Sequence, residues 1–214
     1  MPPFPRSPRS LCIVLALAWP SLALAGLPGG FNSSAPQCIT LVGSRAGVPD
    51  AAAGSFTVEV RDLANNPVAG AAVVIDLSGA TDMSLCADQL DPTASVDCAN
   101  KTVKKFTGAN GSVNFTVLGA SNGGGNATTL LHGGKIFANG TLIASPTVAA
   151  YDLDGSGGVG ANDLAAWLND FGSGNNFGRC DYDCSGGIGA NDFSFWLTEF
   201  GFGTSTESCA SHCP

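Results

Sequence analysis

The spacing of hydrophobic residues changes once along the chain, at about residue 150. Before that point, apolar residues alternate with polar ones or form short β-branched runs, and turn signals such as Asn110-Gly111 and Asn139-Gly140 separate the runs. This pattern predicts β-strands. The predicted strands are residues 37–42, 55–61, 71–77, 102–106, 112–117, 135–137 and 141–144. No amphipathic helix of useful length interrupts them, so the fold class is predicted to be mainly β, with residues 26–150 forming a sandwich or barrel.

After residue 150 the hydrophobic residues follow a helical period twice. A spacing of i, i+3, i+4 and i+7 places residues on one face of a helix. The first set is Leu164, Trp167, Leu168 and Phe171, and the second is Phe193, Trp196, Leu197 and Phe200. Asn162 and Asn191 suit N-caps, and Gly172 and Gly201 suit the C-terminal ends. We therefore predict two short helices, each burying one apolar face.

Each predicted helix follows a copy of the same acidic, glycine-rich stretch. Residues 152–163 return 29 positions later as residues 181–192. Both copies match the calcium loop of EF-hands, in which oxygens at positions 1, 3, 5, 7, 9 and 12 bind the ion and a glycine at position 6 makes the turn. The predicted ligands are Asp152, Asp154, Ser156, Gly158 (through its carbonyl) and Asp163 in the first loop, and Asp181, Asp183, Ser185, Gly187 (through its carbonyl) and Asp192 in the second. Val159 and Ile188, at position 8, are predicted to turn into the core.

The two loops depart from the standard EF-hand loop in three ways. Position 5 is serine, position 9 is glycine, and position 12 is aspartate rather than glutamate. Each site therefore carries three carboxylates, and we expect a calcium affinity of roughly 10⁻⁶ to 10⁻³ M. A Gly/Asp-rich linker between two helices is the alternative interpretation. The duplication of both ligands and helix faces argues against it.

No helix precedes either loop, because residues 147–151 read as a strand and residues 178–180 as irregular chain. A duplicated calcium loop followed by a helix, over Asp152 to about Phe202, resembles the type I dockerin family. The resemblance implies docking onto a cohesin-like or cell-surface protein. It also implies docking contacts at loop positions 10 and 11. These positions are Ala161, Asn162, Ala190 and Asn191, where dockerins usually carry hydroxyl or charged residues.

A second resemblance covers Phe56 to about Val117. The stretches 56–62, 66–75 and 107–115 look like a bacterial Ig-like domain of the invasin type or a carboxypeptidase-regulatory-like module. Both families are β-sandwiches that serve as spacers and adhesion units. The expected organisation is therefore an Ig-like sandwich at 26–150, a dockerin-like domain at 151–202, and a cysteine-containing tail at 203–214.

The first 25 residues have the features of a secretory signal peptide. Arg6 and Arg9 precede an apolar run at 11–18, and Ala23-Leu-Ala25 is a small-residue cleavage signal. We expect a secreted protein, cleaved near Ala25, without a membrane span. Nine acidic residues and one basic residue lie in 151–214, within a chain of net charge −8. This acidity argues against nucleic acid and anionic membranes as partners.

Cys12 lies in the predicted signal peptide, which leaves seven cysteines in the mature protein. In an exported protein these cysteines are expected to form disulfides. Cys86–Cys98 is the first predicted disulfide, because the segment between them reads as a loop. Cys180 and Cys184 are expected to pair with Cys209 and Cys213, which leaves Cys38 unpaired. A zinc site made by the four C-terminal cysteines and His212 is the alternative.

The sequence offers no catalytic constellation, since its two histidines, His132 and His212, lie in no nucleophile or metal motif. We predict a protein that is not an enzyme. A carbohydrate-binding module is disfavoured because residues 26–150 contain no Trp or Tyr, and their five phenylalanines mostly lie in strand patterns typical of core residues. Two hypotheses remain: a C-terminal region that docks onto another protein, and one that packs on its own sandwich. The direct junction at residues 149–151, without a flexible linker, favours the second.

Overall fold

A computed structural model describes residues 26–122, 131–175, 177–201 and 209–213, and it confirms the mainly β class. The predicted signal peptide lies outside the described residues, as do residues 202–208 and Pro214. The strands are β1 (Cys38–Leu41), β2 (Ser44–Arg45), β3 (Val48–Pro49), β4 (Ser55–Glu59), β5 (Ala72–Asp76), β6 (Met83–Leu85), β7 (Ser95–Asp97), β8 (Thr102–Phe106), β9 (Ser112–Thr116), β10 (Gly119–Ser121), β11 (Lys135–Ala138), β12 (Thr141–Ala144) and β13 (Thr147–Ala150). The helices are α1 (Ala51–Gly54), α2 (Ala161–Ser173), the 3-10 turn η1 (Gly178–Cys180) and α3 (Ala190–Phe200).

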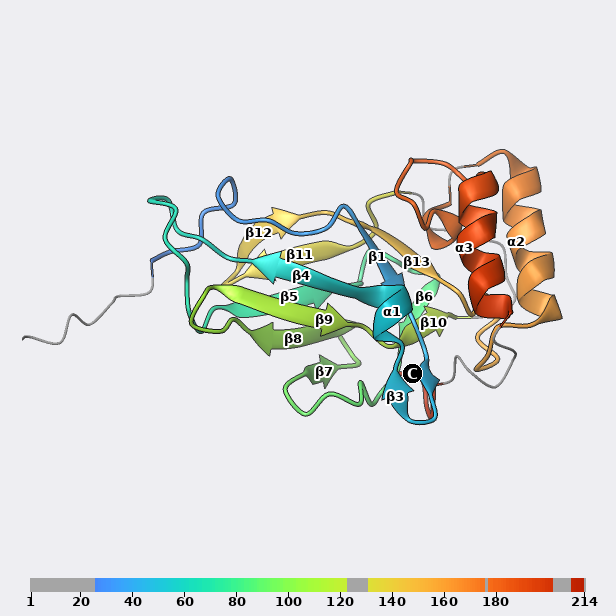
Figure 1. The fold of residues 1–214 in the computed structure, drawn as a ribbon, viewed down its shortest axis with the longest axis horizontal. Helices are drawn as coiled ribbons and strands as arrows, with labels where there is room; N and C mark the ends of the chain where they lie inside the picture. Colours follow the sequence, from blue (N-terminus) through green and yellow to red (C-terminus); the bar gives the residue numbers. More distant parts are fainter. Residues whose placement is uncertain (1–25, 123–130, 176, 202–208, 214) are drawn as a thin grey trace, which may run out of the picture.

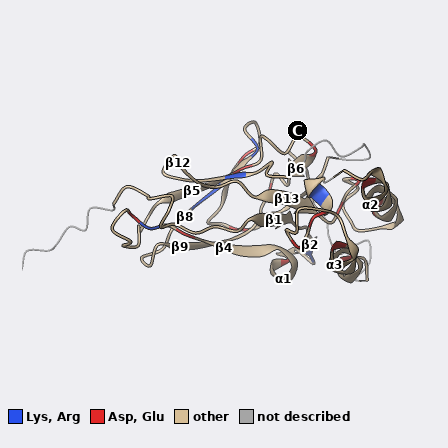
Figure 2. Ribbon diagram, turned by 90° about the horizontal axis from the view of Figure 1, so that it is seen from above, with Lys and Arg blue, Asp and Glu red and all other residues tan. Residues whose placement is uncertain are grey.

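The strands form two layers around one core. Five antiparallel strands make a sheet in the order β12-β11-β5-β8-β7, and β4 pairs antiparallel with β9. Figure 2 shows β5, β8 and β12 in one layer and β4 and β9 in the other. Alternation explains the core: Val73 and Ile75 of β5 point inward, and so do Val113 and Phe115 of β9. The Ig-like identity of this region stays a prediction.

The seven predicted strands are all present, within one or two residues at their ends. The short strands β2, β3, β6, β7 and β10 and the one-turn helix α1 were not predicted, because two to four residues are too few to establish a period. Strand β13 confirms the strand predicted before the first loop. It pairs in parallel with β1, and this pairing aligns Ala150 with Leu41. The first loop therefore starts from the buried end of a strand.

The helices begin two residues earlier than predicted. Gly160 and Gly189, not Asn162 and Asn191, are the N-caps. The physical reason is that Asp163 accepts a hydrogen bond from the N–H of Gly160, and Asp192 does the same for Gly189. Helix α2 also continues through Gly172, which was predicted to end it, to a left-handed Gly174 with φ of 71°. Gly201 does end α3.

The helical region shares an apolar cluster with the strands. Val42, Leu118 and Ala149 from the strand region pack with Tyr151, Leu153, Val159, Trp167, Tyr182 and Trp196 from the region after residue 150. The Tyr182 hydroxyl donates to the Ala150 carbonyl at 2.8 Å, and Trp196 Nε1 donates to the Tyr151 carbonyl at 3.3 Å. Figure 1 shows α2 and α3 side by side at one end of the strand layers. The two regions therefore meet through a common core.

Three disulfides join segments far apart in sequence, and the predicted pairing is wrong. The bonds are Cys38–Cys184, Cys86–Cys209 and Cys98–Cys213, and the free cysteine among the described residues is the buried Cys180. Neither Cys86–Cys98 nor a pairing of Cys180 and Cys184 with Cys209 and Cys213 occurs, and Cys38 is not the unpaired cysteine. Three of the four cysteines of the alternative zinc site, Cys184, Cys209 and Cys213, are engaged in these bonds.

The physical reason is that the C-terminal segment lies along β6. The Ala87 N–H donates to the Ser211 carbonyl at 2.9 Å, and the Cys213 N–H donates to the Leu85 carbonyl at 2.7 Å. This placement brings residues 209–213 to cysteines more than a hundred residues away. Such disulfides suit an oxidising compartment. Among the described residues, none of the helices has the length and apolarity needed to cross a membrane.

Candidate metal centres

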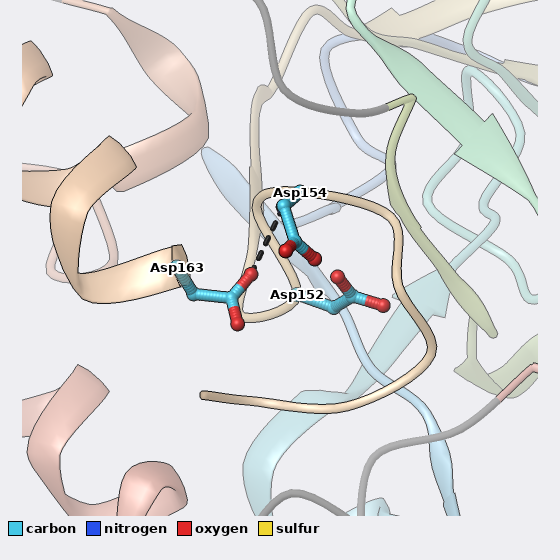
Figure 3. A group of neighbouring side chains, drawn as sticks. All are labelled: Asp152, Asp154 and Asp163. Carbon is cyan, nitrogen blue, oxygen red and sulfur yellow. Dashed lines mark hydrogen bonds between the residues drawn. The ribbon is translucent and has the colours of Figure 1, made fainter. Parts of the chain in front are cut away.

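The first acidic loop brings three carboxylates together. Strand β13 leads into Asp152, and the first turn of α2 holds Asp163. Between them the chain reverses at Gly155 and Gly157, which have φ of 69° and 92°, in the left-handed region that glycine tolerates best. As a result, Asp152, Asp154 and Asp163 offer oxygens that lie within 4.8 Å of one another (Figure 3).

Backbone N–H groups orient these carboxylates. Asp163 Oδ1 accepts from the N–H groups of Leu153 and Asp154, at 2.6 and 2.9 Å, and Figure 3 marks the second of these bonds. The Gly157 N–H donates to Asp152 Oδ2 at 2.8 Å, and the Ser156 N–H donates to Asp154 Oδ1 at 2.8 Å. The loop therefore fixes the direction of each acid through its own backbone.

The second loop repeats this hydrogen-bond pattern at the equivalent positions. Asp192 Oδ1 accepts from Tyr182 at 2.7 Å and from Asp183 at 3.1 Å, and its Oδ2 accepts from Gly189 at 2.8 Å. Asp181 accepts from the N–H of Gly186 at 3.1 Å. Asp181, Asp183 and Asp192 also offer oxygens within 4.8 Å of one another. The predicted carboxylate ligands are thus gathered in both loops.

The pKa values of the loop carboxylates are shifted in different directions. Burial, aided by the charges of Asp163 and Asp154, raises the pKa of Asp152 to about 7. Burial also raises the pKa of Asp163 and of Asp181. Burial would raise the pKa of Asp154 too, but hydrogen bonds from Ser156 outweigh it and the pKa is lowered. Gathering three acids in a partly buried loop is electrostatically costly, and a bound cation offsets that cost.

The remaining predicted ligands are neutral oxygens. Ser156 and Ser185 are exposed, and the Ser185 hydroxyl donates to the Gly187 carbonyl at 3.3 Å. Gly158 is buried. Carboxylates, hydroxyls and carbonyls without nitrogen or sulfur favour a hard cation. The two triads could therefore each hold a metal ion of that class.

The structure also shows where the residues at loop position 8 and the candidate docking residues lie. Val159 is fully buried and Ile188 is half-buried against the shared cluster. All four candidate docking residues, Ala161, Asn162, Ala190 and Asn191, are exposed. Asn191 Nδ2 donates to Asp183 Oδ2 at 3.2 Å, and the Asn162 side chain likewise bonds Asp154. Each of these amides therefore fastens its loop to the start of the following helix.

The predicted helix faces are only partly correct. Trp167 and Trp196 are buried, and Leu164 and Phe193 are half-buried. The other four residues of the two sets are exposed: Leu168 (52%), Phe171 (52%), Leu197 (43%) and Phe200 (39%). The physical reason is that the last aspartate of each loop must face inward, and this requirement rotates the helix away from its most apolar face.

Two buried acidic residues on the helices, Asp170 and Glu199, were not predicted from the sequence. Asp170 and Glu199 each lie seven residues after the last aspartate of their loop, on the same inward face. Asp170 accepts from Arg179 Nε at 2.5 Å and from its Nη2 at 2.9 Å, while Arg179 Nη1 donates to the hydroxyl of Ser121 at 3.2 Å. Burial raises the pKa of Glu199 although the guanidinium of Arg45 opposes it. Alignment of the two copies of the repeat could have identified both acids, because they occupy the same position after their loops.

Arg45 lies in β2 and forms ion pairs with Glu199 and with Asp50. It therefore links α3 to the strand region.

Cys180 follows Arg179 directly, and its thiol lies 3.4 Å from Asp170 Oδ2. Burial, together with the Asp170 charge, raises the pKa of this thiol well above its ordinary value. A buried thiol of this kind is chemically inert.

Comparison of the chain with protein-family models, with curated proteins and with solved structures finds no match. The dockerin-like and Ig-like resemblances therefore stay predictions, and function has to be argued from the chemistry of the sites.

Proposed function

We propose that this is an exported, non-catalytic modular protein whose C-terminal region binds two calcium ions and docks onto a partner protein. The duplicated triads with their matching backbone hydrogen bonds support the two ion sites. Calcium is favoured over magnesium because calcium accepts flexible, irregular sets of oxygens. Magnesium demands a tight octahedron and gives up its waters reluctantly.

The observation that carries the docking role is an exposed apolar surface on the two helices. We call Leu168, Phe171, Leu197 and Phe200 the helix patch; all four are at least 39% exposed. Two of these residues stack on buried tryptophans: Phe171 on Trp167 and Phe200 on Trp196, with ring centroids 5.4 and 5.1 Å apart. Rings held in this way form a rigid apolar surface, a type of surface enriched at protein interfaces. The occupant proposed is a cohesin-like or cell-surface protein with an apolar face of its own.

A second candidate function is a structural or adhesive surface protein in which calcium only stabilises the helical region on the strands. The Cys38–Cys184 bond and the shared apolar cluster favour this candidate. The two candidates use different sides of the helices, because packing on the strands buries Trp167 and Trp196 and leaves the helix patch exposed.

Capture from an extract of the source cells, with calcium and with chelator, separates the two candidates. The matched variants are Leu168→Ser with Leu197→Ser in the helix patch, and Phe31→Ser, which removes a fully exposed ring from the strand region. Docking predicts a partner that is captured only with calcium, lost in the helix-patch variant and retained by Phe31→Ser. Capture that ignores the helix patch, or no capture by a protein that binds two calcium ions in calorimetry, favours the structural candidate.

A further inference from the structure

The outer face of the five-stranded sheet is a polar surface arranged by strand register. Cross-strand pairs place Val74 beside Lys104 and Asp76 beside Thr102, and β7 adds Asp97 next to Thr102. These residues point away from the core, because the residues that alternate with them, Val73, Ile75 and Val103, are fully buried. Side chains of three neighbouring strands therefore share one open face.

This face is hollowed by two adjoining depressions. One, of about 600 Å³, is lined by Asp76, Asp97, Asn100 and Thr102 among others. The other, of about 300 Å³, is lined by Val74, Asp97, Thr102 and Lys104 among others. Asp97 and Thr102 belong to both, so the two depressions form one groove that runs across β5, β8 and β7. We call it the sheet groove.

The groove offers donors and acceptors in close alternation. Asp97 Oδ2 accepts from Asn100 Nδ2 at 2.7 Å, and Asp76 Oδ1 accepts from the Ser78 N–H at 2.8 Å. These bonds hold the carboxylates in place and leave lone pairs for a ligand. The lining carries two acids, Asp76 and Asp97, and two bases, Lys101 and Lys104, so its charge is balanced.

An exposed ring flanks the polar lining. Phe106 is 59% exposed, and Lys104 Nζ lies 5.8 Å from its ring centroid. The phenylalanines of the strand region were expected to be mostly core residues, and Phe106 and Phe31 are exceptions that point to solvent. A flat apolar ring next to hydroxyl, amide and carboxylate groups is complementary to a sugar, which has an apolar ring face and a rim of hydroxyls.

We propose that the sheet groove binds a neutral, polyhydroxylated polymer, namely a glycan chain. Balanced charge disfavours a polyanion such as nucleic acid. An extended peptide would add to a free strand edge through backbone hydrogen bonds, whereas side chains line this groove and it crosses the strands. A metal ion is disfavoured, because the acidic groups suited to metal binding in the described part of the chain are the two loop triads.

The test is retardation of the full-length protein in native gels containing one of four soluble neutral glycans: xylan, mixed-linkage β-glucan, galactomannan or dextran. At least one glycan should retard the protein, equally with calcium and with chelator. Phe106→Ala and Asp97→Asn should each weaken binding by about tenfold or more, which corresponds to about 1.4 kcal/mol. Phe31→Ala, which removes an exposed ring outside the groove, should bind as the unaltered protein does.

Retardation by none of the four glycans would overturn the proposal, and so would unchanged binding by both groove variants. Equal loss in Phe31→Ala, or stronger binding to a polyanion such as heparin than to any neutral glycan, would also overturn it. Unchanged urea denaturation of Phe106→Ala and Asp97→Asn serves as the check that each groove variant keeps its fold. Independence from calcium keeps this result separate from the docking role.

Discussion

The two halves of the helical region have the same loop but are fastened differently. At loop position 4 the first half has Gly155, with φ of 69°, and the second has Cys184, with φ of 61°. Cys184 adopts this left-handed conformation, uncommon for a residue with a side chain, and its disulfide ties the second loop to Cys38, the first residue of β1. The first loop has no equivalent covalent link among the described cysteines.

The inward acid of each helix also has a different partner. Asp170 of α2 pairs with Arg179, which lies only nine residues away, and both side chains are buried. Glu199 of α3 pairs with Arg45 of β2, more than 150 residues away and partly exposed. The repeat thus fixes where the acid points, while the surrounding chain decides what it binds. The first half depends on a buried ion pair and the second on a covalent bond to the strands.

The largest expected effect is loss of the buried ion pair. Arg179→Met leaves the Asp170 carboxylate buried without its guanidinium, which typically costs about 3–5 kcal/mol. We expect the free energy of unfolding in calcium, measured by urea denaturation, to fall by that amount. Adding Asp170→Leu should recover part of the loss, because no unpaired charge is then buried. A single variant that loses less than about 1 kcal/mol would contradict the role of this pair.

Removing the covalent link is expected to make the second half behave like the first. In Cys38→Ala with Cys184→Gly, the glycine suits the left-handed backbone and matches Gly155 of the first loop. Loss of a disulfide that closes so long a segment typically costs about 2–5 kcal/mol. Urea denaturation measures the loss. If α3 in this variant stays as protected from hydrogen exchange in chelator as before, the disulfide does not fasten it.

Arg45→Met is expected to cost less than Arg179→Met, about 1 kcal/mol, because the Arg45 side chain is partly exposed. Glu199 has a raised pKa in the folded protein, and loss of Arg45 raises it further. A carboxyl group with a raised folded pKa favours folding at low pH, and this contribution is lost as pH rises through the folded pKa. The deficit of the variant should therefore grow with pH. A deficit that is constant with pH would exclude the ion pair as its source.

The smallest effect is expected from the amides that link each loop to its helix. Asn162→Ala and Asn191→Ala each remove one hydrogen bond to a loop carboxylate, Asp154 or Asp183. Each should weaken calcium binding by about fivefold, or about 1 kcal/mol, in titration calorimetry. Because the two asparagines stand at the same position of the duplicated loop, the two losses should match. A large difference between them would show that the loops are less alike than their hydrogen bonds indicate.

Local patterns in the sequence predicted local structure well. Alternation located the strands from β4 to β12 that exceed three residues, and the duplicated loop located both acidic triads, because their ligands lie within twelve residues of one another. Features that depend on distant segments were missed. The partners of Cys38, Cys86 and Cys98 lie 115 to 146 residues away, and chain spacing carries no information on which segments the fold brings together.

The spacing of apolar residues on the helices predicted the wrong buried face, for a different reason. Leu168 and Phe171 fit a buried face by period, but the inward direction of α2 is set by Asp163, which must reach its loop, and by Asp170, which must reach Arg179. Hydrophobic spacing alone cannot detect this competition. The residues of the predicted helix faces that stay exposed form the helix patch. The prediction of burial therefore fails at the surface that is proposed to bind a partner.

Hydrogen exchange of α2 and α3, with calcium and with chelator, tests the central claim that the two triads are metal centres on which the helices depend. The account predicts that α2 loses protection in chelator, that α3 loses less because Cys184 is tied to Cys38, and that the five-stranded sheet is unchanged. Equal protection of both helices in calcium and in chelator would contradict it, and would mean that packing and disulfides alone hold the helical region.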